Sequence, residues 1–275
     1  MVMAKTMLIT GSSSGVGEAT AKLFAERGFN VVATMRNTAK APHFGDLPNL
    51  IVERLDVEDV ASIDQAIRAA QNKFGGIDLV INNAGYGQYG VFEQIPMEKV
   101  RENFEVNVFG VMNVMQRIIP IFRVQKGGII LNVSSCGGRI GIPASSIYIS
   151  TKFALEGFTE TVSHELASQN IITKLYEPGA IYSPFHERSA RENMGSGGIE
   201  SYDHFLESTT ASLMKLAAGA ATTKLVAEDI FAAATDGTNR IRYCAPYGVE
   251  ALIKAKRALD DEGYENFARS MFPGK

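Results

Sequence analysis

The sequence predicts an α/β fold with a doubly wound parallel sheet of about seven strands and helices on both faces. Short apolar, β-rich runs alternate along the chain with longer amphipathic stretches of helical periodicity. Most of the short runs are apolar throughout, which is typical of strands covered on both faces. A glycine-rich loop joins the first strand to the first helix, as expected for this class.

Seven runs are the strand candidates. They are Thr6–Thr10, Val31–Thr34, Leu50–Leu55, Leu79–Asn82, Gly128–Ser134, Ile172–Glu177 and Arg240–Cys244. The helix candidates between them are Gly15–Arg27, Val57–Phe74, Met97–Arg123, Ile147–Ser168 and Lys224–Thr235. Strand–helix alternation predicts right-handed crossovers and therefore parallel strands.

No linker, charge block or internal repeat divides the chain, so residues 1–275 are expected to form a single domain. The stretch 183–223 interrupts the alternation. It shows no strand pattern and carries Gly195, Gly197 and Gly198 in its middle. Because long insertions in compact α/β domains are usually functional, we expect it to be a lid over a substrate.

Composition excludes several function classes. The formal net charge is -3, from 27 Lys+Arg and 30 Asp+Glu, so no basic field attracts nucleic acid. No apolar run approaches the roughly 20 residues that span a bilayer, and the first residues are too weakly apolar for a secretion signal. Two cysteines and four scattered histidines predict no disulfide framework and no metal site. We therefore expect a cytoplasmic protein.

The glycine-rich loop has the chemistry of a phosphate cradle. Gly11 allows a tight turn out of the strand, Gly15 lets backbone approach an anion, and Gly17 permits close packing of the helix. The helix N-terminus adds unpaired N–H groups and partial positive charge. The candidate contacts with a dinucleotide are Gly11, Ser13, Ser14, Gly15, Val16 and Gly17. The alternative interpretation is a surface turn.

The second strand indicates which dinucleotide is bound. A free ribose 2′-hydroxyl calls for a carboxylate at the end of this strand, whereas a 2′-phosphate calls for an arginine. The segment VVATMRNTAKA contains no acidic residue and places Arg36 just past the strand. A guanidinium binds phosphate bidentately. We therefore expect NADP(H) to be favoured over NAD(H), with a solvated surface arginine as the alternative.

Tyr148 and Lys152 are the candidate catalytic pair. They are four residues apart on a predicted helix and so share one face. A nearby ammonium is expected to lower the pKa of the phenol, which makes Tyr148 a proton donor to a carbonyl. Ser135 follows the strand 128–134 and can hold the substrate oxygen, with Ser134 as the alternative donor.

These residues resemble the motifs of the short-chain dehydrogenase/reductase family, including its 17-beta-hydroxysteroid dehydrogenase-like members. The motifs stand in the family's order, which also favours Ser135 over Ser134. They are the Thr10–Gly17 loop, Asp56-Val57, Asn82-Asn83-Ala84-Gly85, Asn107, Ser135, Tyr148-x-x-x-Lys152 and Pro178-Gly179. The resemblance implies a Rossmann-like fold and covers the chain to about Ser183 and the last strand.

The resemblance also implies a role for each motif. Tyr148 would be the acid/base, Lys152 would bind the nicotinamide ribose, Ser135 would orient the substrate and Asn107 would hold a relay water. The implied cofactor contacts further along the chain are Asp56, Val57, Asn83, Ala84, Gly85, Pro178, Gly179, Ile181 and Ser183. The chain departs from the family at Ser183, where threonine is common, and at Ser14, where some NADP-preferring members carry a basic residue.

The expected function is therefore an NAD(P)H-dependent oxidoreductase that interconverts a carbonyl and a secondary alcohol. The expected substrate is a small, apolar molecule, and VVATMRN is similar to steroid-active relatives. Relatives also imply a homodimer or homotetramer, formed through the helices at 97–123 and 147–168. Two alternatives remain: a catalytically silent NADP(H)-binding sensor or scaffold, and a nucleotide-sugar epimerase, which would require glycine at Ser14.

Overall fold

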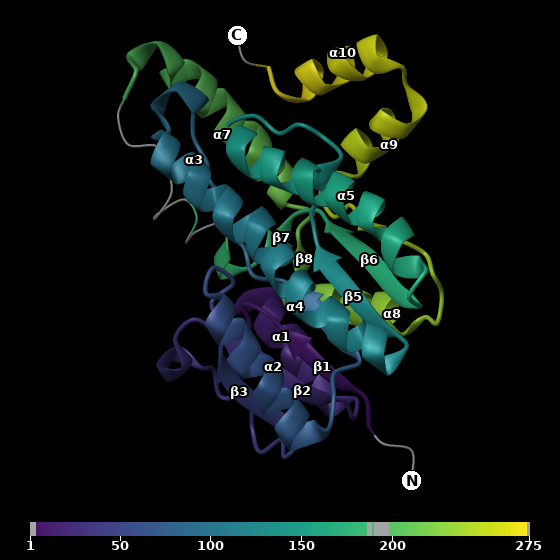
Figure 1. Ribbon diagram of the computed structural model, residues 1–275. Helices are drawn as coiled ribbons and strands as arrows, with labels where there is room; N and C mark the ends of the chain where they lie inside the picture. Colours follow the sequence, from purple (N-terminus) through teal and green to yellow (C-terminus); the bar gives the residue numbers. More distant parts are fainter. Residues whose placement is uncertain (1–3, 186–188, 190–197, 274–275) are drawn as a thin grey trace.

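A parallel seven-stranded sheet forms the centre of the molecule, as predicted. The computed structural model describes residues 4–185, 189 and 198–273. Its strands run in the order β3-β2-β1-β4-β5-β6-β9, all parallel (Figure 1). The strands are β1 (Thr6–Ile9), β2 (Asn30–Met35), β3 (Leu50–Arg54), β4 (Leu79–Asn82), β5 (Gly128–Val133), β6 (Ile171–Pro178) and β9 (Arg242–Ala245). The order reverses between β1 and β4, where ligands bind in such sheets.

Helices cover both faces of this sheet. On one face α1 (Gly15–Glu26) packs on β1 and β2, and α8 (Thr223–Thr235) packs on β6; Phe24 and Ile230 are buried in the cluster between these helices and the sheet. On the other face lie α2 (Val60–Phe74), α4 (Gly110–Gln125) and α5 (Ser146–Ala167). Side chains of a central strand point alternately to the two faces of the sheet, so each strand packs against both helical layers, as Leu8 and Ile9 do. None of the described helices has both the length and the apolar character to cross a membrane.

The helix predicted over Met97–Arg123 is interrupted, and that prediction is corrected. It consists of α3 (Met97–Phe104), a π-helical turn η3 (Glu105–Phe109) and α4. The apolar pattern on both sides of the turn is helical, so the sequence alone indicated one helix. A Cβ at Gly110 would lie 2.5 Å from Cγ2 of Val57, so the chain passes very close to the β3–α2 connection here. π-turns of this kind are frequent at functional sites.

Between 183 and 223 the structure differs from the expectation of no strand. Ile181–Tyr182 (β7) pairs in parallel with Ala221–Thr222 (β8), a bridge too short to leave a pattern in the sequence. The same region contains η5 (Glu200–Tyr202) and α7 (Asp203–Ala217). Part of the proposed lid, 186–188 and 190–197, lies outside the described residues.

The C-terminal helices α9 (Glu250–Ala258) and α10 (Asp261–Met271) were not predicted. In Figure 1 they lie at the end of the molecule near α7, away from β1–β3. Leu252 and Tyr264 belong to a third apolar cluster with Cys136 and Ile140, which follow β5. These helices therefore pack against the loop after β5.

Short 3-10 turns complete the described part of the chain: η1 (Thr38–Lys40), η2 (Phe92–Gln94) and η4 (Cys136–Gly138).

The start of α1 packs against the neighbouring loops without room for a side chain. A Cβ at Gly17 would lie 2.3 Å from the carbonyl oxygen of Gly11 and 2.6 Å from Nδ2 of Asn83. Gly157, on α5, has no heavy atom within 4 Å of the same position. Gly157 can therefore serve as the control position for a substitution at Gly17.

We expect Gly17→Ala to lower the free energy of unfolding by about 1–3 kcal/mol, because the new methyl group meets backbone that cannot move freely. The control Gly157→Ala should raise it by about 0.5–1 kcal/mol, since alanine has less backbone freedom to lose. Urea denaturation measures both. Equal effects of the two substitutions would contradict the close packing at Gly17.

Candidate functional site

The carboxyl ends of β1 and β4 are tied together by hydrogen bonds. The backbone N–H groups of Asn83 and Ala84 both donate to Oγ1 of Thr10 at 3.0 Å. Nδ2 of Asn83 donates to the carbonyls of Thr10 and Gly11 at 3.0 Å. A Cβ on Gly11 would lie 2.8 Å from Cα of Ala84. Asn83 and Ala84 therefore hold the glycine-rich loop in shape.

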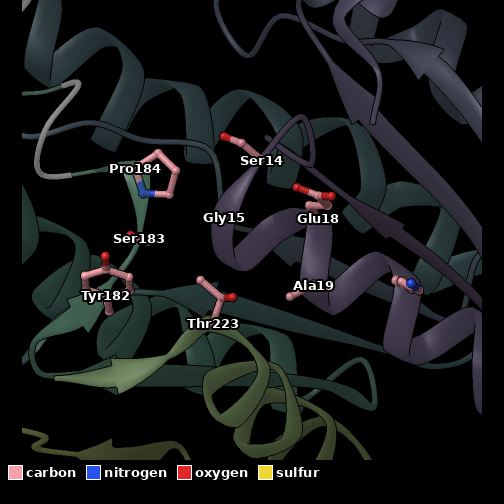
Figure 2. Close-up of a pocket in the computed structure, with 9 residues that line it drawn as sticks. Ser14, Gly15, Glu18, Ala19, Tyr182, Ser183, Pro184 and Thr223 are labelled. Atoms are coloured by element: carbon pink, nitrogen blue, oxygen red, sulfur yellow. The ribbon is translucent and has the colours of Figure 1, made fainter. Parts of the chain in front are cut away.

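An open cavity of about 570 Å³ lies beside the glycine-rich loop. In Figure 2 the first turns of α1, with Ser14 and Glu18, form one side, and Tyr182, Ser183 and Pro184 form the other. Gly15 adopts φ +65, and its missing Cβ would be 3.9 Å from Cβ of Ser183. A helix N-terminus and a backbone cradle that side chains leave open fit a pyrophosphate. Gly15, Ser14 and Ser183 thus line one cavity.

Arg36 is exposed directly after β2, where a guanidinium can reach a 2′-phosphate. Its acidic neighbour Glu58 leaves no signal in the sequence around Arg36. Burial and Asp56 raise the pKa of the Glu58 carboxyl, whereas the charge of Arg36 lowers it. This electrostatic interaction places Arg36 close to Asp56-Val57-Glu58, although the segment around Arg36 contains no acid of its own.

Asp56 and Val57 follow β3 at the same edge of the sheet. Asp56 Oδ1 accepts a hydrogen bond from the backbone of Glu58 at 3.2 Å, and Val57 is buried against Gly110. Gly85 follows β4 and faces Asn107, whose Oδ1 would be 3.0 Å from a Cβ there. Both of these segments, whose residues the resemblance implies as cofactor contacts, therefore lie at the edge where ligands bind, and Val57 and Gly85 also have packing roles.

Tyr148 and Lys152 lie on α5, one turn apart, as predicted. Nζ of Lys152 donates to the carbonyl of Val133 at 2.9 Å and lies 5.7 Å from the centroid of the Tyr148 ring. Lys152 is only 7% exposed, so its ammonium is taken out of water at the end of β5. Both side chains therefore lie near the end of β5, where the loop that carries Ser135 begins.

The expected lowering of the Tyr148 pKa by Lys152 is wrong for this structure. Burial raises the pKa of Tyr148 to about 12, and the hydrogen bond with Ser135 opposes that rise. Burial lowers the pKa of Lys152 to about 8, and the charge of Glu156 opposes that shift. Because Nζ bonds to Val133 rather than to the phenol, desolvation decides the state of both groups. Tyr148 therefore holds its proton at neutral pH.

Ser135, and not Ser134, is the serine that faces Tyr148. Besides the bond to Tyr148, its Oγ lies 3.5 Å from the carbonyl of Pro178 and accepts from the N–H of Gly137 at 3.0 Å. Ser134 is 3% exposed, and its hydroxyl points toward Glu156 instead. The capping bond to Gly137 fixes the Ser135 side chain.

Asn107 lies in the π-turn and is 1% exposed. Its Nδ2 donates to the carbonyl of Tyr86 at 2.9 Å and to Oγ1 of Thr151 at 3.1 Å. Its Oδ1 accepts from the N–H of Tyr86 at 3.1 Å. Asn107 therefore joins the loop after β4 to α5 beside Lys152, and its side chain is engaged by protein groups.

The segment after β6 is anchored from the C-terminal side. The N–H of Gly179 donates to Ala245 at 2.8 Å, and the N–H of Ala180 donates to Tyr247 at 2.7 Å. A Cβ on Gly179 would lie 2.2 Å from the carbonyl oxygen of Tyr247, so only glycine fits. Pro178 and Gly179 thus lead Ile181 into β7 and deliver Ser183 to the cavity.

Two aromatic side chains adjoin the Tyr148 ring. The rings of Tyr89 and Phe185 have centroids 6.2 Å and 5.9 Å from that of Tyr148. Burial raises the pKa of the Tyr89 phenol. From the sequence, Tyr89 follows the Asn-Asn-Ala-Gly turn and could be either a pocket residue or a loop aromatic. Within the described residues, no three His, Cys, Asp or Glu side chains form a candidate metal cluster.

Comparison with known families matches residues 5–194 to the short chain dehydrogenase model. The chain belongs to the short-chain dehydrogenase/reductase family. An uncharacterized oxidoreductase of Schizosaccharomyces pombe is 36% identical over 227 residues, 82% of this chain and 94% of that protein. The uncharacterized oxidoreductase YusZ of Bacillus subtilis is 35% identical over 274 residues, 96% of this chain and 97% of its own. A 3-ketodihydrosphingosine reductase of Bacteroides thetaiotaomicron is 34% identical over 202 residues, covering 74% and 73%.

Solved structures of this family share the fold. A short-chain dehydrogenase from Streptomyces avermitilis gives a TM-score of 0.79 at 25% identity and covers 98% of this chain and 99% of its own. ElxO with NADP bound gives 0.76 at 26% identity, covering 90% and 100%. The 3-ketoacyl-(acyl-carrier-protein) reductase from Brucella melitensis, complexed with NADH, gives 0.72 at 27% identity, covering 90% and 97%. This chain is thus an oxidoreductase with a nucleotide-binding, Rossmann-like fold.

The buried ammonium predicts an early titration. We expect Lys152 to lose its proton near pH 8 rather than at its ordinary value of 10.5, because burial disfavours the charged form. NMR of protein labelled with 13Cε-lysine measures it, and the signal that disappears in Lys152→Arg assigns it. A midpoint above pH 10 would contradict the desolvated environment.

Proposed function

We propose that this protein is an NADP(H)-dependent reductase that converts an apolar carbonyl compound into a secondary alcohol by hydride transfer. The observation that carries the proposal is the meeting of three groups at the carboxyl edge of the sheet. The phenol of Tyr148 is hydrogen-bonded to Ser135, and the ammonium of Lys152 lies one turn away on the same helix. A dinucleotide, when bound beside these groups, would supply the hydride.

The protein residues provide orientation and a proton. Tyr148 keeps its proton at neutral pH because its pKa is about 12, so it can donate to the oxygen of a carbonyl as negative charge develops there. Ser135 holds the same oxygen, since its hydroxyl is fixed beside the phenol. Lys152 stabilises the phenolate that remains, because an ammonium in a desolvated site acts strongly on a nearby charge.

Asn107 has the position of a relay residue. Its side chain is bonded to Thr151, the residue that precedes Lys152 on α5. We propose that the π-turn around Asn107 holds a water that returns protons to Lys152. Tyr89 and Phe185 surround the Tyr148 ring with aromatic surface, which supports an apolar substrate.

The glycine-rich loop, Asp56-Val57 and Pro178–Ser183 are the proposed contacts with the dinucleotide. The exposed guanidinium of Arg36 supports NADP(H), as does the NADP bound by ElxO. Glu58 and the NADH bound by the Brucella reductase favour the other dinucleotide. We assign the preference to Arg36, because a fork of donors next to the strand end matches a 2′-phosphate.

The proposed partners are a small carbonyl substrate and further copies of this chain. Phe109 and Phe153 are each 47% exposed on the helical layer that contains α4 and α5. Exposed aromatic residues on long helices support a homodimer or homotetramer. The two free thiols, Cys136 and Cys244, support a reducing, cytoplasmic location.

A catalytically silent sensor on the same fold would not need the four catalytic positions. Ser135, Tyr148 and Lys152 are brought together here, and Asn107 adjoins α5, which favours the enzyme. A nucleotide-sugar epimerase is disfavoured by the serine at Ser14 and by a match to reductases over most of the chain.

Tyr148→Phe should lower kcat/KM for carbonyl reduction by about 10²–10⁴-fold, because the proton donor is removed. Binding of NADPH, followed by its fluorescence, should stay within twofold, since the ring remains. Tyr243→Phe is the control, because its phenol bonds to Asp236 and Lys174 at the β9 edge of the sheet, outside the proposed site. Substantial activity in Tyr148→Phe would refute the mechanism.

Arg36→Asp should invert the preference for the dinucleotide. The wild-type chain should use NADPH with a higher kcat/KM than NADH, and the variant should lose about ten- to hundredfold with NADPH. The control is Arg68→Asp, an exposed arginine on α2. A wild-type preference for NADH would contradict the role of Arg36.

A further inference from the structure

A group of buried charges lies directly behind Lys152. Glu156 stands one turn further along α5, with its side chain 6% exposed. Glu177, on β6, is 0% exposed and immediately precedes Pro178. Burying a carboxylate is unfavourable unless a group of opposite charge pairs with it. Glu156 and Glu177 therefore need a cationic partner.

Arg242, on β9, holds both carboxylates. Its Nε lies 3.1 Å from Oε2 of Glu156 and 3.3 Å from Oε1 of Glu177. Its Nη2 pairs with Glu160 on the outer part of α5. Arg139, from the loop after β5, lies 3.3 Å from the same oxygen of Glu177. One guanidinium therefore links α5, β6 and β9.

The loop that carries Ser135 packs on this group without a gap. A Cβ at Gly138 would lie 2.7 Å from Cγ of Glu156 and 3.1 Å from the carbonyl oxygen of Lys152. Glu177 leads into Pro178, whose carbonyl faces Oγ of Ser135 at 3.5 Å. The charged group thus adjoins α5, the loop that carries Ser135 and the segment that begins at Pro178.

The ionisation states of these groups are linked: Arg242 acts on Glu156, and Glu156 acts on Lys152. Burial raises the pKa of Glu156, and Arg242 counters that rise. The charge of Glu156 in turn raises the pKa of Lys152 against the effect of burial. The other ionisable groups facing this cluster are Glu160, Glu177, Arg139 and the thiols of Cys136 and Cys244.

We propose that Glu156 and Arg242 are positioning residues for the proposed reduction: Arg242 keeps the buried Glu156 carboxylate ionised, and that carboxylate keeps Lys152 protonated at working pH. Neither residue has to touch the substrate. The inference rests on the proposed function for its consequence in turnover, but the ionisation of Lys152 is a property of the protein alone.

A purely structural role would have a different signature. An ion pair that only fastens β9 to α5 would lower the free energy of unfolding when broken, and the titration of Lys152 would not move. We call the electrostatic link from Arg242 through Glu156 to Lys152 the charge relay. If it operates, breaking it shifts the titration midpoint of Lys152 even when the fold is intact. It also makes the two residues act through one path, so their effects should not add.

The experiment compares Glu156→Gln, Arg242→Met and the double variant by the 13Cε-lysine titration and by the pH profile of kcat. Each single variant should lower the Lys152 midpoint by about one pH unit, the scale of a neighbouring opposite charge. The double variant should shift it no further. The fall of kcat on the alkaline side should move by the same amount.

Glu165→Gln, an exposed carboxylate on the same helix, is the control and should leave the midpoint unchanged. Glu156→Asp keeps the charge and should restore the wild-type midpoint, and it serves as the second variant if Glu156→Gln does not fold. Unchanged midpoints in folded Glu156→Gln or Arg242→Met, or additive shifts in the double variant, would overturn the proposal.

The titration needs no substrate, which separates the two proposals. If the wild-type chain reduces no carbonyl, the proposed function fails, and the midpoints still decide the charge relay. If the wild-type chain is active and the midpoints do not move, only the relay fails.

Discussion

The site depends on one buried contact, the hydrogen bond from Nζ of Lys152 to the carbonyl of Val133 at 2.9 Å. It ties α5 to the end of β5, two residues before Ser135. Because Tyr148 precedes Lys152 by one turn, the same contact brings its phenol beside that serine. Placing an ammonium there is unfavourable in itself, since burial lowers its pKa to about 8. The carboxylate of Glu156 behind it offsets part of that cost.

Features encoded by local patterns were predictable. Most of the seven strands needed only continuous apolar runs, and the Tyr148–Lys152 pair needed only helical spacing. Features created by distant contacts were not. The π-turn at Asn107 has a helical apolar pattern on both sides, and Glu58 meets Arg36 only because β2 and β3 are neighbours. Arg242 reaches Glu156 across 86 positions of sequence, although the carboxylate itself stands at a readable spacing after Lys152.

The protonation states also required the structure. From sequence, an ammonium four residues from a phenol suggests an acidified phenol, but desolvation acts on both groups and dominates here. As a result, the phenol of Tyr148 keeps its proton at neutral pH, and the pKa of the Lys152 ammonium, about 8, lies well below its ordinary value. This state suits a donor that gives up its proton only when charge develops on a bound oxygen. It also explains why a buried counter-charge next to Lys152 has a use beyond packing.

Following an isotope through one turnover tests the central claim most directly. NADPH deuterated at both C4 positions is mixed with excess protein and a carbonyl compound that it reduces, and the alcohol is analysed by mass spectrometry and NMR. Hydride transfer predicts one deuterium on the carbinol carbon and a hydroxyl proton from the solvent. An alcohol without deuterium on that carbon, or oxidised dinucleotide without alcohol, would contradict a reductase.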